Sequence, residues 1–562
     1  MHHHLNLRSK VIIMLSVMAS LFLVALDQTI ISTSLGKIVE EFNAFSSLGW
    51  VVTAYLIATT VTVPIAGKLS DLFGRRILLL LGITIFSAGS LMGGMSGNID
   101  QLIMWRAFQG IGGGIITANT FAIVGDLFAA RERGKWQGLI GAVFGVSSVV
   151  GPLLGGFLAD ANNVFGLTTN WRWTLFINVP IGILAFVVIA IFCPTLKHDK
   201  HPKVDYIGAA LLAMALTILV LAIDNTEAIF GGFMSSTGLT LANLRVIMFL
   251  LVAILVTIFI VTERRAKEPI LPTYFFKNRN FVLMMTIATL FGSAFMGSIL
   301  YLTQFNQQVF AATPTQSGLM LLPMVGGMTF ASIGIGQLIS RKGKYKLFMQ
   351  LGFATATIAI ACLTTLNPSS TYGFEAVVMI FLGMGMGVAM PVINLVVQNE
   401  FAQHDLGAAT SSSQLFRSLG STIGVAIFGS ILTAGIVTSL GDMSNNAYVK
   451  SLSKSAAVAK IGDLNNTDTL LNLNMHDIKS EINKQSTLAF AKLPAPIAKQ
   501  AETQFKNQQK DFSTIIVKAY SDGMHTIFVA ATALMTAATI VSFAIKEKPL
   551  RSAKASETPG EI

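Results

Sequence analysis

Charged residues are scarce in this 562-residue chain: they make up 12% of it, against roughly 25% in soluble domains. Cysteine is nearly absent, since only Cys193 and Cys362 occur, far apart and each near the end of an apolar run. This argues against a disulfide framework and against a cysteine-based metal site. A nucleotide-binding loop of the GxxxxGK[ST] type is also missing, so we expect no cofactor and an ion gradient as the energy source.

What the chain does contain is apolar sequence, at 53% hydrophobic residues and a mean hydropathy of +0.66. A bilayer core requires about 20 apolar residues per helix. Fourteen runs meet that length, at 11–35, 47–67, 77–96, 100–124, 136–159, 172–193, 206–224, 245–263, 281–306, 315–339, 346–366, 374–398, 407–434 and 523–545. The sequence therefore predicts an all-α polytopic membrane protein with both termini on one side.

The formal net charge of +11 is unevenly distributed between the connections. Lys and Arg cluster in every second connection, at 68–76, 131–135, 197–203, 264–279 and 341–346. The short connections on the other side contribute only Lys37, with Arg172 and Arg245 at helix edges. This bias predicts cytoplasmic termini. It also favours contact with the lipid bilayer over nucleic acid, because the basic residues lie in short loops between apolar runs.

The connection 435–522 is long, polar and predicted to lie outside the cytoplasm. Apolar residues recur in it at roughly helical spacing, which indicates a small helical subdomain. A passive linker is the alternative interpretation.

Two pairs of segments repeat in the same order along the chain. "GKLSDLFGRR" from Gly67 resembles "GQLISRKGKY" from Gly336, and "QGIGGG" at 109–114 resembles "LGMGMG" at 382–387. Such repeats are typical of a transporter built from two parallel six-helix bundles. The predicted domains are an N-terminal bundle, two inserted helices, a C-terminal bundle in two pieces, the outer loop and a tail, at 1–200, 201–270, 271–434 with 523–545, 435–522 and 546–562.

Asp27 is interpreted as the only acid well inside a predicted span, and Arg106 is the basic residue of the span 100–124. A charge in hydrocarbon costs at least ~2.5–3.5 kcal/mol, so each such residue requires a reason. Counted from the outer helix ends, the two residues lie at similar depth. We expect Asp27 to gain and lose a proton, with Arg106 as its partner in coupling. A purely structural ion bridge is the alternative.

The turn "GKLSDLFGRR" is predicted to take part in gating. Gly67 and Gly74 permit a tight turn, and Asp71 can pair with Arg75, with Arg76 or with the end of a neighbouring helix. Such a contact exists only while the inner helix ends are together, so it favours the outward-open state. Positive-inside anchoring by Arg75 and Arg76 is the simpler alternative.

The span 136–159 is crowded with helix breakers. Small residues four apart place a close-packing face on a helix, and a proline bends it. This face is predicted to form a seam between the two halves, with simple GxxxG packing as the alternative. The residues concerned are Gly141, Gly145, Gly151, Pro152, Gly155 and Gly156.

Uncharged polar side chains and methionines recur within the spans. Methionine conforms to varied shapes, as a promiscuous apolar pocket requires. We expect a cavity for lipophilic compounds, with cations attracted to Asp27. Arg417 could attract anionic groups or hydrogen-bond carbonyls. The candidate cavity residues are Gln109, Asn119, Gln304, Asn306, Asn394, Gln398, Gln414 and Arg417.

The motifs "LDQTI", "GKLSDLFGRR", "RAFQGIGGG", "GVSSVVGPLLGG" and "NWRWTLFINVPIG" occur in order along the spans. With them the chain resembles the fourteen-helix drug:proton antiporters of the major facilitator superfamily, the QacA/EmrB-like branch. The resemblance implies a coupling acid at Asp27, a coupling arginine at Arg106, and an export motif in the span 136–159. It also implies a multi-pass transporter, not an enzyme, of a bacterial cytoplasmic membrane.

Other functions stay open at this point. The chain could export one endogenous lipid, siderophore or metabolite. As in EmrB-like pumps, it could instead be the membrane component of an envelope-spanning complex whose outer loop binds an adaptor protein. A nutrient symporter is disfavoured by the span 136–159.

Overall fold

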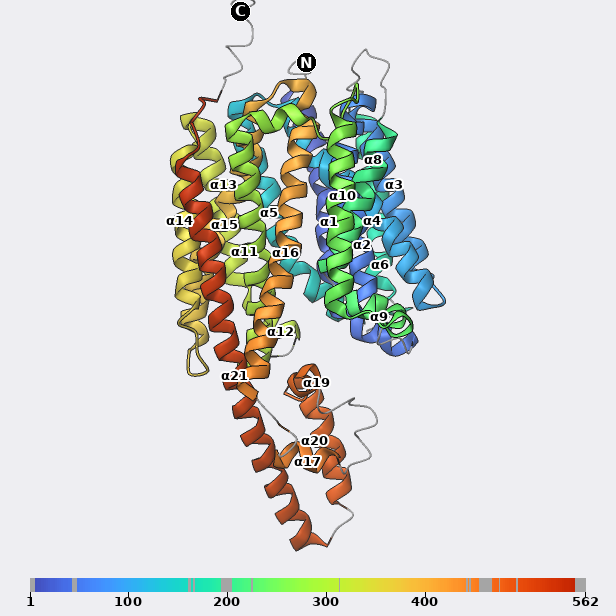
Figure 1. Ribbon diagram of the computed structural model, residues 1–562, viewed down its shortest axis with the longest axis vertical. Coiled ribbons are helices and arrows are strands. Elements are labelled where there is room, and N and C mark those ends of the chain that lie inside the picture. Colours follow the sequence, from blue (N-terminus) through green and yellow to red (C-terminus); the bar gives the residue numbers. More distant parts are fainter. Residues whose placement is uncertain are drawn as a thin grey trace, which may run out of the picture.

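The computed structural model describes residues 6–42, 48–159, 163–164, 167–193, 205–223, 226–312, 314–440, 443, 446–453, 467–474, 476–491 and 494–550. Among these residues, fourteen helical segments are long and apolar enough to cross a membrane, which confirms the predicted number. The elements form two groups of helices side by side, with a helical part projecting from one end (Figure 1).

The N-terminal half comprises seven helices and a short hairpin. They are α1 (Leu7–Phe42), α2 (Leu48–Phe73), α3 (Arg75–Gly94), α4 (Ile99–Leu127), α5 (Ala130–Ala159), α6 (Trp173–Phe176) and α7 (Asn178–Phe192), with the antiparallel strands β1 (Asn163–Val164) and β2 (Leu167–Thr168) between α5 and α6. The predicted span 172–193 is therefore two helices that meet at Ile177.

Two long helices and a short one connect the halves. These are α8 (Tyr206–Ile223), α9 (Thr226–Thr237) and α10 (Leu241–Glu263), followed by the 3-10 turn η2 (Thr273–Lys277). Helix α8 packs against α10, α2 and α16 (Leu406–Leu440). The inserted pair thus reaches the line along which the two halves meet, where Leu211 and Leu216 pack with Leu415.

The C-terminal half repeats the order of the first. It comprises α11 (Arg279–Gln308), α12 (Pro314–Met320), α13 (Leu322–Lys342), α14 (Lys346–Leu363), α15 (Tyr372–Glu400), η3 (Gln403–Asp405), α16 and α21 (Ala495–Phe543). Within this half α15 packs on α13 and α14, and α11 packs on α16 and α21. In the first half α4 packs on α2 and α3, and α1 packs on α5 and α7. The repeat seen in the sequence is therefore a repeat of packing.

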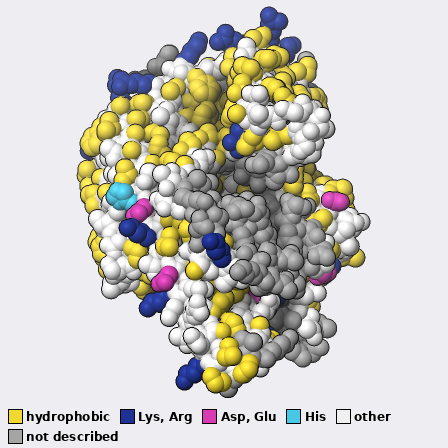
Figure 2. All heavy atoms as spheres, turned by 60° about the horizontal axis from the view of Figure 1, so that its bottom comes forward, with side chains coloured by type: hydrophobic (Ala, Val, Ile, Leu, Met, Phe, Trp, Pro, Cys, Tyr) yellow, Lys and Arg dark blue, Asp and Glu magenta, His cyan; other side chains and the backbone are white. Residues whose placement is uncertain are grey.

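Across the interface, α5 packs against α13 and α15, and α16 packs against α2 and α4. The start of α1 and the end of α21 lie at the same end of the molecule (Figure 1). Lys10 lies over the Phe128 ring there, and the backbone N–H of Leu550 donates to Gly343 O at 3.2 Å. Lys and Arg side chains gather at this end, at the top of Figure 2, and much of the side surface is hydrophobic. We call it the basic end.

Helix α21 departs from the predicted domain boundary at residue 523. It is 49 residues long, which corresponds to about 74 Å at 1.5 Å per residue, far more than a bilayer core. Residues 497–522 are polar but contain neither Gly nor Pro, so nothing in them ends the helix. The polar part therefore continues the last span outward as one rod (Figure 1).

The projecting part of α21 carries three short helices, α17 (Ala447–Ser453), α19 (Thr467–Asn472) and α20 (His476–Phe490). Together they form what we call the outer subdomain, at the bottom of Figure 1. It contacts the bundle through Asn474, whose side chain donates to Gln308 O of α11 at 3.1 Å. Lys479 donates to Ser513 at 2.8 Å, and burial lowers the pKa of its ammonium group. The expected helical character of this loop is thus observed in its described residues.

Candidate functional site

Asp27 of α1 and Arg106 of α4 form an ion pair inside the N-terminal half. Arg106 Nη1 donates to Asp27 Oδ2 at 2.5 Å. The side chains are 0% and 1% exposed, so solvent reaches neither of them in this state. Removing two charges from water is expensive unless the remaining lone pairs and protons are also satisfied. The surroundings of the pair supply those partners.

Two side-chain amides complete the shell of the carboxylate. Gln109 Nε2 and Asn178 Nδ2 donate to Asp27 Oδ1 at 2.9 and 2.8 Å. The same two nitrogens donate to Ser90 Oγ at 3.0 and 2.9 Å, and Ser90 in turn donates to Leu175 O at 3.0 Å. Asp27 is thereby connected to α3, α4 and α7 at once. A change in the charge of Asp27 would therefore alter the hydrogen bonds that join it to these three helices.

The guanidinium of Arg106 has further contacts with α2. It lies 4.4 Å from the centre of the Tyr55 ring, and its Nε donates to Val51 O at 3.4 Å. The close approach of α2 depends on glycine: a Cβ at Gly110 would lie 2.5 Å from Tyr55 O, and one at Gly113 would lie 2.7 Å from the Tyr55 hydroxyl oxygen. The glycines of "RAFQGIGGG" therefore make room for an aromatic face over the buried cation.

At the basic end, Asp71 connects the two halves. Its carboxylate pairs with Arg75 and accepts the backbone N–H of Gly407 at 3.2 Å and of Ala408 at 3.0 Å, at the start of α16. A carboxylate at a helix N-terminus is favoured by the helix dipole. Arg75 also donates to Asp126 at 2.7 Å. We call this set of groups the Asp71 contact.

The turn glycines and Arg76 have different surroundings. A Cβ at Gly67 would collide with Ser411 of α16, so glycine lets α2 and α16 touch. Gly74 has a φ of 92°, which other residues rarely adopt. Arg76 donates to Ala190 O within its own half. The structure therefore brings Asp71 and Gly67, but not Arg76, to the interface between the halves.

The repeat-related position in the second half uses the opposite charge. Ser340 replaces Asp71 there, and Arg131 of α5 donates to the backbone oxygens of Ser340 and Arg341 in the last turn of α13. A cation is favoured at a helix C-terminus as an anion is at an N-terminus. Both contacts join helix ends of different halves at the basic end. Separation of the halves at this end would break them.

The glycines of α5 face two different helices. A Cβ at Gly141 would meet Ser332 of α13, and one at Gly145 would lie 3.1 Å from Thr329 Oγ1. A Cβ at Gly151 would instead collide with Thr29 of α1. Ten residues of α-helix rotate the direction by about 80° from the starting face. Gly141 and Gly145 therefore face the other half, whereas Gly151 faces α1 within its own half.

The other predicted members of this seam give less information. Gly155 is buried, and α5 continues through Pro152 and Gly156, whose side-chain surroundings lie outside the described residues.

Three of the predicted cavity residues form one polar group in the C-terminal half. Gln414 Nε2 donates to Asn394 Oδ1 at 3.2 Å, and Arg417 Nη2 donates to Gln414 Oε1 at 2.5 Å. Arg417 is half-buried, and within the described part of the chain it forms no salt bridge.

The other predicted cavity residues serve mainly helix packing. Gln398 donates to Phe121 O and accepts from Gln137, at 2.9 Å each, across the two halves. Asn119 donates to Ile115 O of its own helix at 2.8 Å. Gln304 accepts from Tyr520 of α21 at 2.9 Å. Gln109 belongs to the Asp27 shell, and Asn306 is fully buried on α11.

Asp27 lies in the interior of α1, but it is not the only fully buried acid in the described spans. Glu375, four residues from the start of α15, is also 0% exposed. At a helix N-terminus an acid ordinarily faces water, so its burial could not be inferred from its position in the sequence. Ser90, Asn178 and Tyr55 were missed as well. Of these, Asn178 stands inside the motif "NWRWTLFINVPIG", which was the available signal.

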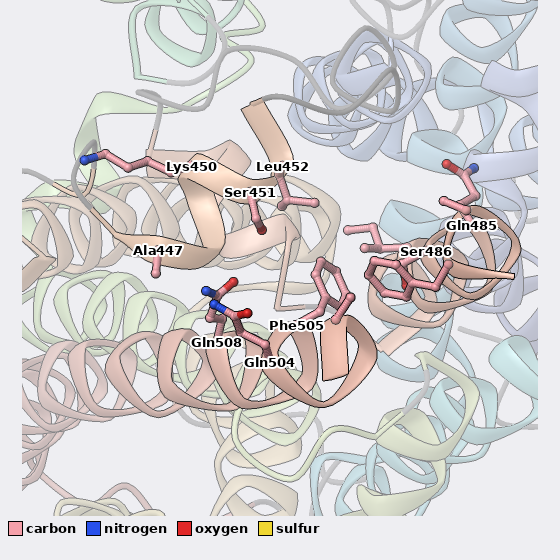
Figure 3. A pocket seen from close by; sticks show the side chains of 13 residues that line it. Ala447, Lys450, Ser451, Leu452, Gln485, Ser486, Gln504, Phe505 and Gln508 are labelled. Atoms are coloured by element: carbon pink, nitrogen blue, oxygen red, sulfur yellow. The ribbon is translucent and has the colours of Figure 1, made fainter. Parts of the chain in front are cut away.

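A cavity of about 690 Å³ lies in the outer subdomain, between α17, α20 and α21 (Figure 3). Leu452, Ile482, Phe490 and Phe505 are among its lining residues, which include none of the predicted cavity residues. It is outside the bundle and apart from Asp27. Among the described residues, no group of three His, Cys, Asp or Glu side chains is placed to hold a metal ion.

Comparison with known proteins fits this architecture. Residues 17–425 match the family model described as Major Facilitator Superfamily. The chain is 36% identical over 421 residues to the multidrug transporter protein MdtP of Bacillus subtilis, covering 74% of each chain. It is 33% identical over 432 residues to multidrug resistance protein 3 of the same organism, covering 76% of this chain and 81% of the relative.

Solved structures give the same fold. The crystal structure of the human organic anion transporter MFSD10 aligns with a TM-score of 0.57 at 15% identity, over 75% of this chain and 93% of that one. The proton:xylose symporter XylE aligns with the same TM-score at 14% identity, over 77% and 91%. Fold, packing repeat and sequence agree: this chain is a multi-pass membrane transporter that belongs to the major facilitator superfamily.

Proposed function

We propose that the protein is a proton-coupled antiporter that exports lipophilic compounds, cations among them, from the cytoplasm across a bacterial cytoplasmic membrane. The observation that carries this proposal is the Asp27–Arg106 pair, sealed inside the N-terminal half and joined to three other helices. A static bridge at this place could be replaced by apolar packing without loss of stability. A group that must change its charge could not.

Protonation of Asp27 is the coupling step in this proposal. The ionised carboxylate accepts from Arg106, Gln109 and Asn178. A proton removes the negative charge and converts one oxygen into a donor, so not all three donors can stay. Arg106 then depends on Gln109 Oε1, 2.7 Å away, on Val51 O and on the Tyr55 ring. The packing of α1 against α4 and α7 is thereby linked to proton binding.

The contacts at the basic end supply the alternating access. The Asp71 contact and Arg131 join the halves at that end, which the Lys and Arg bias assigns to the cytoplasm. In this state cytoplasmic cargo is excluded. We infer that the proton reaches Asp27 from the outside after the outer side opens, and leaves toward the cytoplasm once the basic end has opened.

The names of the relatives and the lining expected in the C-terminal half support the proposed cargo. Two relatives at 33–36% identity are named for multidrug transport or resistance, and another, at 30% identity over 452 residues, is the efflux pump FUS6 of Gibberella fujikuroi. The half-buried Arg417–Gln414 group adds hydrogen-bond donors to an otherwise apolar, methionine-rich half. This combination suits varied lipophilic molecules more than a sugar.

Ethidium efflux from proteoliposomes tests this function. The protein is reconstituted, ethidium is loaded, and a pH gradient is imposed with the acidic side at the outer face. We expect efflux that depends on the gradient and stops with a protonophore. Efflux that ignores the gradient would refute proton coupling. An absence of efflux for ethidium and for a panel of other lipophilic dyes would favour a dedicated exporter of one endogenous compound.

Membership in an envelope-spanning complex is a second candidate function. It is favoured by the polar continuation of α21 and the helices that it carries beyond the bundle (Figure 1). Deletion of residues 440–515 distinguishes the two. If the outer subdomain serves only to bind an adaptor protein, the deletion leaves efflux from proteoliposomes intact and abolishes resistance in cells. If it is part of the transport path, both are lost.

A further inference from the structure

Glu375 is a carboxyl group buried in the C-terminal half without an ion-pair partner among the described residues. Neither of its oxygens has a hydrogen-bond partner. The side-chain amide of Asn306 on α11 lies close enough to interact with this carboxyl group, but no hydrogen bond of ordinary geometry joins the two. Both polar atoms of that amide are also buried and without a hydrogen bond. An unpaired acid and an unpaired amide thus lie next to each other.

Among the described residues, no cationic side chain of the surrounding helices forms a salt bridge with Glu375. The helices packed against α15 are α5, α11, α13, α14 and α16. Their charged residues lie toward the basic end, apart from Arg417, which donates to Gln414. Tyr372, which lies close enough to interact with Glu375, donates its hydroxyl group to Met320 O at 3.1 Å instead. Within the part of the chain that the structure describes, Glu375 is therefore not paired with an ionised side chain.

The position of this pair follows the repeat between the two halves. Helices α11 and α15 correspond to α1 and α4, the two helices that hold Asp27 and Arg106. In the sequence repeat Met379 corresponds to Arg106, and Glu375 precedes Met379 by one helical turn on the outer side. Each half therefore carries a buried acid between its corresponding helices.

Protonation of Glu375 would allow its carboxyl group and the Asn306 amide to satisfy each other's hydrogen-bonding groups. An ionised carboxylate only accepts hydrogen bonds and is expensive to bury without a cation. A protonated carboxyl group has one O–H donor and one acceptor oxygen, which match the acceptor and donor of the Asn306 amide. We propose that Glu375 and Asn306 form a second proton-binding site, in the C-terminal half, and that it holds a proton in this state. The transport consequence rests on the function proposed above; the protonation does not.

Infrared spectroscopy of the purified full-length protein tests the protonation directly. The C=O stretch of a protonated carboxyl group is separate from that of a carboxylate. We expect such a band at neutral pH in the wild type, its partial loss in Glu375→Gln, and its full retention in Asp100→Asn. Asp100 is the matched control, because it also lies in the first turn of its helix, the repeat-related α4, but is exposed.

Glutamine has the shape and neutrality of protonated glutamate, so E375Q should unfold at the wild-type temperature. Identical infrared spectra for E375Q and the wild type would overturn the proposal, and so would an E375Q protein that unfolds at markedly lower temperature.

Transport at a fixed pH difference tests the consequence. Raising the pH on both sides together keeps the driving force constant. Because Asp27 also exchanges its proton during transport, we expect efflux by every variant to decline as the pH rises, and E375Q efflux to decline less steeply than that of the wild type and D100N, in which Glu375 loses its proton as well. An E375Q profile that declines like the wild type would overturn a role in transport. If the wild type shows no gradient-driven efflux, the proposed function fails, and the infrared result still decides the protonation of Glu375.

Discussion

Substitution of Asp71 by asparagine should open the basic end. In the closed state the Asp71 carboxylate accepts two backbone N–H groups at the start of α16 and pairs with Arg75. Asparagine keeps the shape but has one acceptor oxygen, and its NH₂ group faces a second donor. Arg75 retains Asp126 at 2.7 Å, so the substitution does not leave an unpaired buried cation. The substitution therefore weakens the contact between the halves and removes the ion pair with Arg75 within the N-terminal half.

The shift in the closed-to-open equilibrium can be worked out from the interactions that D71N removes. A hydrogen bond to a charged group contributes about 1.5–3 kcal/mol, and an anion at a helix N-terminus contributes up to ~2 kcal/mol. One such bond and part of the dipole interaction are lost, which together amount to about 2 kcal/mol. Because each 1.4 kcal/mol is tenfold, about 2 kcal/mol shifts the closed-to-open equilibrium about 30-fold.

Thiol labelling measures this shift. Ser411 is 1% exposed and lies against Gly67 in the closed seam. In a Cys193→Ser, Cys362→Ser background, Ser411→Cys reacts with an impermeant maleimide only when the basic end opens. We expect D71N to raise the labelling rate in inside-out vesicles about 30-fold, and the D100N control to leave it unchanged. Equal rates in D71N and the wild type would refute the assignment of the Asp71 contact as a closing element.

Two further substitutions test the packing. Arg131→Gln removes the side-chain donors to the last turn of α13. Because Arg131 is exposed, we expect the closed state to lose about 1 kcal/mol or less of stability, and the labelling rate to rise less than in D71N. A larger rise than in D71N would contradict this ranking. Gly383→Val places a side chain against the Met324 backbone, so we expect it to lower the free energy of unfolding by about 1–3 kcal/mol, measured by thermal unfolding. Gly326→Val is the control, because a side chain there meets open space, and it should leave stability unchanged. Equal unfolding temperatures of the two variants would refute the packing argument.

The architecture could be predicted from sequence because its determinants are local. Apolar length defines the spans, and the fixed rise of the α-helix allowed the depths of Asp27 and Arg106 to be compared. The turn at Gly67 was identified because glycines and paired charges stand close together in the sequence. Its partner, the start of α16, could not be named, because the approach of two helices distant in sequence is not encoded in either helix alone.

Side-chain surroundings could not be predicted from the sequence. Gln109 was predicted to line a cavity, and in this state it lies in the buried hydrogen-bond network of Asp27; a polar side chain within a span is compatible with either place. Glu375 was overlooked because a residue near a span end can be solvated or covered, depending on neighbouring helices. The length of α21 was underestimated because hydropathy marks where a helix leaves the apolar core, not where it ends.

Gradient-driven ethidium efflux by Asp27→Asn is the most direct test of the central claim that this carboxyl group couples proton binding to export. The variant and the D100N control are reconstituted in parallel, after size-exclusion chromatography shows that both are folded. We predict that D27N loses efflux driven by the pH gradient and that D100N retains it. Full gradient-dependent efflux by D27N would contradict the account.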